Sequence, residues 1–151
     1  MDKLSILEAK LKQMPFTSEK LLFLTGSSPL CRNNFIKMAE EKLNIPSVNL
    51  SLSLTERLLT MSVKERVYKF DGLLQDIIPE KTSSIFLTSI EVLFEPSLEV
   101  NVFSLLKKFS RTYTLIVNWP GEYDGNYLIY SKPEHREYIR EEYFSELIIS
   151  I

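Results

Sequence analysis

Two patterns of hydrophobic residues alternate along the chain. Short, nearly continuous apolar runs are typical of buried strands, whereas apolar residues spaced three and four apart are typical of one helix face. Apolar runs predict strands over residues 21–25, 47–50, 84–88, 112–118 and 127–130, followed by a strand or docked tail over 147–151. Helical spacing predicts helices over residues 2–14, 29–43, 54–78, 100–111 and 134–144.

Strands that alternate with helices favour a parallel sheet covered by helices on both faces. We therefore predict one α/β domain over 1–151, with three layers, a mostly parallel sheet of about five strands and right-handed crossovers. An amphipathic helix in 1–14 begins the domain, and a polar helix with a tail ends it over 133–151. The helical pattern over 54–78 is interrupted near Ser62 and Gly72.

Composition limits the number of domains and the classes of protein to which the chain could belong. A chain of 151 residues that is 44% hydrophobic and 25% charged fits one globular domain with a real core. The formal net charge of −2 provides no global basic field for nucleic acid or an anionic membrane. One cysteine forms no internal disulfide, and no apolar run approaches the about 20 residues that cross a bilayer. We expect a cytoplasmic protein.

The connection between the first predicted strand and the next helix carries the register of a phosphate-binding loop. A working P-loop reads G-x-x-x-x-G-K-[ST], so that backbone N–H groups and the lysine hold phosphates while the hydroxyl holds magnesium. Here Cys31 replaces the second glycine, Arg32 the lysine and Asn33 the hydroxyl residue. The candidate nucleotide or anion ligands are Gly26, Ser27, Ser28, Arg32 and Asn33.

A plain strand-to-helix turn explains the same residues without any ligand. Ser28 is a good helix N-cap, Pro29 a good first helical residue and Gly26 a turn glycine. Pro29 also lacks the N–H group that a phosphate loop would use, and Arg32 presents a planar fork where a compact ammonium is needed.

Further candidates follow the third and fourth predicted strands. Thr88 stands where a nucleotidase strand normally ends in a magnesium-binding aspartate, and Glu91 is the one candidate catalytic residue, as a base that polarises water. Thr88 and Glu91 also have capping-box spacing, and we favour the cap or surface interpretation. Asn118 and Arg111 are candidates for a sensor and for an interface contact, but we favour a turn role for Asn118 and a helix-dipole role for Arg111.

No metal site is predicted, because His135 and Cys31 form no ligand cluster.

Four segments make the chain resemble the BrxF family of small P-loop proteins from type III bacteriophage-exclusion (BREX) defence systems. They are 22–33, 85–94 with Ile-Glu-Val-Leu-Phe, 109–111 with 114–121 as Phe-Ser-Arg and Asn-Trp-Pro-Gly, and 130–138 with Tyr-Ser-Lys-Pro-Glu-His-Arg-Glu-Tyr.

The resemblance implies a compact P-loop NTPase-like domain of the additional-strand (ASCE, AAA-like) class. It also implies partners in an antiphage system: a larger ATPase, a methyltransferase and a phosphatase-like protein, or a second copy of the chain. Because the lysine, hydroxyl and aspartate are all replaced, we expect a non-catalytic assembly or regulatory subunit that needs no ATP or magnesium. A nucleotide-binding switch or weak ATPase is the alternative, and a DNA-contacting accessory protein is a third.

Overall fold

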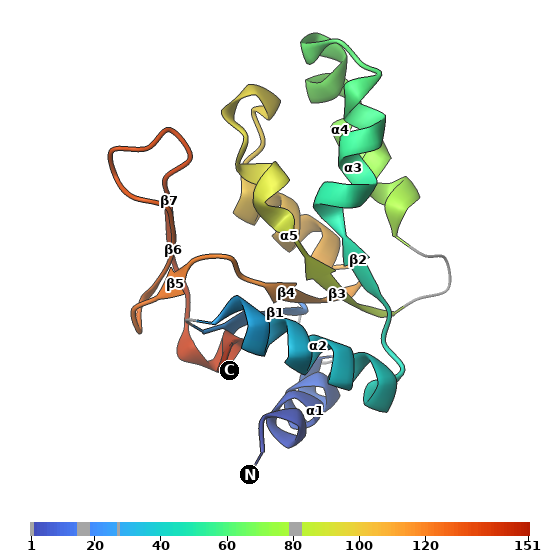
Figure 1. Cartoon of the computed structure of the whole chain (residues 1–151). Coiled ribbons are helices and arrows are strands. Elements are labelled where there is room, and N and C mark those ends of the chain that lie inside the picture. Colours follow the sequence, from blue (N-terminus) through green and yellow to red (C-terminus); the bar gives the residue numbers. More distant parts are fainter. Residues whose placement is uncertain (1, 15–18, 27, 79–82) are drawn as a thin grey trace.

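Five parallel strands form the centre of the molecule, in the order β2-β3-β4-β1-β8 (Figure 1). This computed structural model describes residues 2–14, 19–26, 28–78 and 83–151. The strands are β1 (Leu21–Thr25), β2 (Ser47–Asn49), β3 (Ser84–Thr88), β4 (Thr114–Asn118) and β8 (Ile148–Ser150). Every pair in this sheet is parallel, which confirms the predicted α/β class and the mostly parallel five-stranded sheet.

Helices cover both faces of the sheet (Figure 1). On one side lie α1 (Lys3–Gln13) and α2 (Pro29–Leu43), and on the other α3 (Leu50–Leu59), α4 (Val63–Ile77) and α5 (Val102–Ser110). Short 3₁₀ helices span Ile90–Phe94, Pro96–Leu98 and Ser145–Leu147. The result is the three-layer arrangement that alternating strands and helices predict.

Alternate residues of the strands belong to two separate hydrophobic cores. In β1, Leu22 and Leu24 pack with α1 and α2, whereas Leu21 and Phe23 pack with the α3 and α5 side. All five residues of β1 are buried, since both faces of the strand are covered. Burial on both faces explains why the strands read as continuous apolar runs rather than as alternating patterns.

Most predicted elements lie where the pattern places them, and β1, α2 and β3 match their predicted bounds. The helical region 54–78 differs in its details. It begins earlier, because the Asn49 side chain caps α3 by accepting a hydrogen bond from the Leu52 N–H at 2.9 Å. A break does occur near Ser62, but the predicted interruption at Gly72 is wrong, because α4 continues through it.

The C-terminal prediction over 134–144 is also wrong. This segment is a turn followed by strand β7 (Ile139–Glu142), which pairs with β6 (Tyr127–Tyr130) in a three-stranded antiparallel sheet with β5 (Glu122–Tyr123). Burial alternates along β7 with a period of two, as it does in a strand. The fifth strand of the main sheet is therefore β8, within the predicted 147–151 segment, and the 127–130 strand belongs to the smaller sheet.

Candidate functional site

The β1 to α2 turn lies at the carboxyl edge of the main sheet, where ligands of open α/β sheets usually bind. Gly26 follows β1 with φ +154°, and a Cβ atom built on it would lie 2.9 Å from the backbone oxygen of Ile151. The Ile151 N–H also donates to the Thr25 carbonyl at 2.8 Å. The glycine thus permits close passage of the segment after β8, which is a structural reason for its presence.

Helix α2 begins early, at Pro29, so residues 29–33 form its first turn. A phosphate loop instead keeps the equivalents of residues 29–31 before the helix, where their N–H groups converge on the anion. Here the Cys31 N–H donates to the Ser28 hydroxyl oxygen at 3.2 Å and the Arg32 N–H donates to the Ser28 carbonyl. The N-cap interpretation of Ser28 is confirmed, and Ser27 lies outside the described residues.

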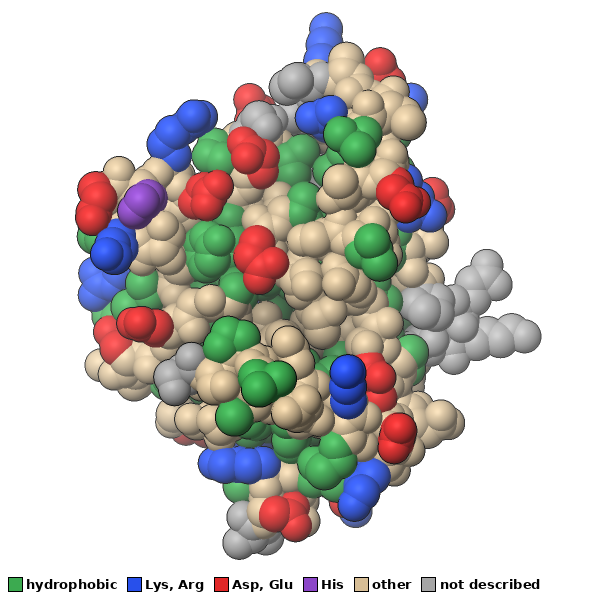
Figure 2. Space-filling model, in the orientation of Figure 1, with side chains coloured by type: hydrophobic (Ala, Val, Ile, Leu, Met, Phe, Trp, Pro, Cys, Tyr) green, Lys and Arg blue, Asp and Glu red, His purple; other side chains and the backbone are tan. Residues whose placement is uncertain are grey.

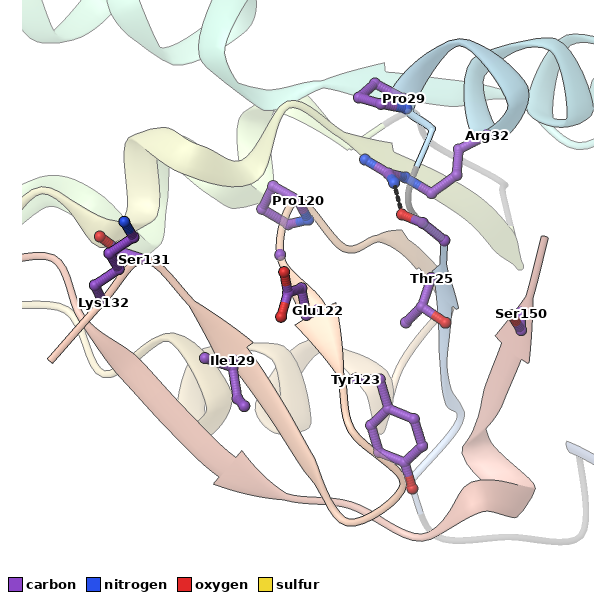
Figure 3. A pocket seen from close by; sticks show the side chains of 12 residues that line it. Thr25, Pro29, Arg32, Pro120, Glu122, Tyr123, Ile129, Ser131, Lys132 and Ser150 are labelled. Carbon is purple, nitrogen blue, oxygen red and sulfur yellow. Dashed lines mark hydrogen bonds between the residues drawn. The ribbon is translucent and has the colours of Figure 1, made fainter.

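Arg32 folds back over the turn instead of projecting into solvent, and it is only 5% exposed. Its Nη1 group donates to the Gly26 carbonyl oxygen, as the dashed line in Figure 3 marks. Its Nε group donates to the Asn118 Oδ1 atom at 2.8 Å. The guanidinium therefore closes the space beside the turn in which an intact loop would hold phosphate.

Asn118 connects the turn to the end of β4. Besides accepting from Arg32, it donates from Nδ2 to the Asn33 Oδ1 atom at 3.3 Å. The structure thus joins three of the predicted candidates, Arg32, Asn33 and Asn118, in one hydrogen-bonded network. Burial lowers the pKa of Arg32, and the negative charge of Glu91 acts in the opposite direction.

The segment after β3 does not form the predicted capping box. Ser89 stands in the left-handed region with φ 51° and provides no side-chain cap to the 3₁₀ helix Ile90–Phe94. The Thr88 hydroxyl instead faces the neighbouring strand and donates to the Val48 carbonyl at 3.4 Å. Glu91 is exposed, in agreement with the surface interpretation.

Arg111 lies apart from this network. It follows α5 and precedes β4, so it stands at the amino edge of the sheet, opposite Asn118. Its backbone N–H closes the last turn of α5 on the carbonyls of Lys108 and Phe109. The helix-end interpretation therefore describes its position, and it does not reach the Gly26 turn of the same chain.

A hollow of about 810 Å³ opens beside Arg32 (Figure 3). One wall comes from the ends of β1 and β8 and the start of α2, and the other from the turn after β4 and from β5 and β6. Sequence reasoning missed this second wall because it took the 127–130 strand as the fifth strand of the main sheet, whereas this strand belongs to the smaller antiparallel sheet. Its lining residues are Pro120, Gly121, Glu122, Tyr123, Ile129, Ser131 and Lys132.

The residues present do not fit a magnesium nucleotide in the turn. The N–H groups of Cys31 and Arg32 are already bonded, the Arg32 side chain closes the space, and a threonine hydroxyl stands in the place of the metal-binding carboxylate. In the described part of the chain, no three His, Cys, Asp or Glu residues group as metal ligands would. The turn therefore has the geometry of a closed strand-to-helix connection.

Surface charge does not point to a nucleic-acid interface on the face that Figure 2 shows. Lys and Arg side chains are interspersed there with Asp and Glu, and the single histidine, His135, lies among them at the hairpin. Within the ranges that the structure describes, no helix has the length and apolarity needed to span a membrane.

Comparisons with protein-family models, with curated proteins and with solved structures find no match to this chain.

Proposed function

We propose that this chain is a non-catalytic, P-loop NTPase-like subunit that acts in the assembly or regulation of a larger complex. The closed turn at Gly26 carries this proposal, because Arg32 occupies the space beside it and bonds both Gly26 and Asn118. The strand order supports the ancestry, since β4 is inserted between β1 and β3 as in the additional-strand class.

The identity of the complex rests on the family resemblance. The residues shared with the BrxF family support a BREX antiphage system as the setting, with its larger ATPase, methyltransferase or phosphatase-like protein, or a second copy, as the partner. Asn118, Pro120 and Gly121 belong to the resembling segments; Asn118 is part of the hydrogen-bonded network, and Pro120 and Gly121 line the hollow. This coincidence connects the resemblance to the site.

A steady-state measurement of phosphate release with ATP and Mg²⁺ tests the non-catalytic role. We expect phosphate release at the rate of a protein-free control, because Thr88 stands where an active enzyme has its magnesium-binding aspartate. Glu91→Gln is the matched variant, since it removes the one candidate base while keeping the size of an exposed side chain. Rapid turnover that Glu91→Gln abolishes would establish the weak ATPase alternative and refute the proposal.

A further inference from the structure

Arg32 is a buried cation without an ion pair among the residues that the structure describes. Its two hydrogen bonds go to neutral oxygens, those of Gly26 and Asn118. Glu91 raises the pKa of Arg32 through its charge, but it does not form an ion pair with the guanidinium. A guanidinium has five N–H donors, so donors remain for another acceptor. Burying such a charge is unfavourable unless an anion compensates it.

Arg32 lines the hollow together with two other charged side chains. Lys132 comes from the opposite wall, just after β6, and Glu122 lies between them in Figure 3. In that view the three charged groups follow one another across the hollow as cation, carboxylate and cation. A volume of about 810 Å³ falls within the range of small-molecule sites, about 300 to 1,000 Å³.

We infer that this hollow binds a small molecule with two oxyanion groups, carboxylate or phosphate, and a hydroxyl or ammonium donor between them. Arg32 binds one oxyanion and supplies the planar fork suited to such groups, and Lys132 binds the other. Glu122 accepts the hydrogen bond of the central donor and disfavours a third anionic group at that position. The ligand occupies the hollow in front of the guanidinium, so the Gly26 turn stays closed.

This inference goes beyond the proposed function and does not depend on it. A non-catalytic subunit with such a site would respond to a metabolite, whereas the same subunit without it would act through protein contacts alone. The two ideas also fail separately. Loss of the metabolite site leaves the phosphate-release result unchanged, and ATP turnover would leave the titrations with 3-hydroxyglutarate and glutarate below unchanged.

Calorimetric titration at low ionic strength tests the site with 3-hydroxyglutarate, glutarate and pyrophosphate. 3-Hydroxyglutarate has a central hydroxyl that glutarate lacks, so Glu122 should favour 3-hydroxyglutarate over glutarate by about fivefold. Pyrophosphate and glutarate both lack a central donor and so distinguish the two oxyanion sources: pyrophosphate binding tighter than that of glutarate assigns the site to phosphate, and weaker binding assigns it to carboxylate. No saturable heat with either 3-hydroxyglutarate or pyrophosphate overturns the inference.

Variants then assign the binding to the hollow. Lys132→Gln should weaken the tighter probe about tenfold, since it removes one charged hydrogen bond. Lys37→Gln is the matched control, because Lys37 is also an exposed lysine but lies on α2 and does not line the hollow. Equal affinities of the wild type and Lys132→Gln would overturn the inference, and this comparison stands even where Arg32→Gln fails to fold.

Discussion

Replacing Trp119 by Ala is expected to lower the free energy of unfolding by about 4 kcal/mol, within the range for deleting a buried tryptophan. The Trp119 side chain has no exposed surface and contacts three aromatic rings. Its ring centroid lies 5.9 Å from that of Phe23, 5.7 Å from that of Phe94 and 5.6 Å from that of Phe103. The substitution therefore removes the centre of the larger core.

Urea denaturation followed by far-ultraviolet circular dichroism measures this loss, since the variant lacks the only tryptophan for fluorescence. Trp119→Phe separates packing from hydrogen bonding. It keeps an aromatic ring but removes the Nε1–H group, which donates to the Ile129 carbonyl at 3.2 Å, so about 1 to 2 kcal/mol should be lost. A loss below about 1 kcal/mol in Trp119→Ala would be incompatible with the buried position.

Gly121→Ala should destabilise the chain by about 3 kcal/mol, at the upper end of the usual range for overpacking. An added Cβ would lie 1.9 Å from the backbone oxygen of Ile129 and 3.1 Å from the Trp119 Nε1 atom. The nearest obstacle is backbone, so rotation of a side chain cannot relieve the clash. The second wall of the hollow would have to move away from Trp119.

Gly72→Ala is the matched control for this substitution. A Cβ on Gly72 meets no atom within 4 Å, and the residue lies inside α4, where alanine is the better helix former. Thermal denaturation should therefore show a lower Tm for Gly121→Ala and an unchanged or slightly higher Tm for Gly72→Ala. Equal Tm values for the two variants would show that the tight contact at Ile129 is absent.

Local patterns were sufficient to predict most of the main sheet. β1, β3 and α2 are marked by apolar runs, by the Ser28 cap and by Pro29, all of which act within a few residues. The segment 134–144 was mispredicted, because its tyrosines also fit a helical spacing. In the structure, contacts with distant residues decide its conformation: Tyr143 packs on Phe23, and Arg140 lies 3.7 Å from the Tyr127 ring centroid.

The candidate site was likewise predicted only where local patterns decide it. Sequence analysis identified Arg32, Asn33 and Asn118 individually, because each occupies a recognisable place after a strand or at the start of a helix. The bond from Arg32 to Asn118 joins residues 86 positions apart, and parallel pairing of β1 with β4 brings them together. Whether Arg32 leaves the space beside the turn open or bonds back onto Gly26 depends on that pairing, so local patterns carried no signal for the closed turn.

Titration of the protein with ATP, with and without Mg²⁺, tests the closed turn most directly. We predict no Mg²⁺-dependent heat and no affinity for ATP beyond that for pyrophosphate. We also expect no rise in Tm with added nucleotide beyond the rise with pyrophosphate, since a ligand that binds only the folded state must raise Tm. One-to-one binding of ATP that requires Mg²⁺ and exceeds pyrophosphate binding by tenfold or more would contradict a closed turn.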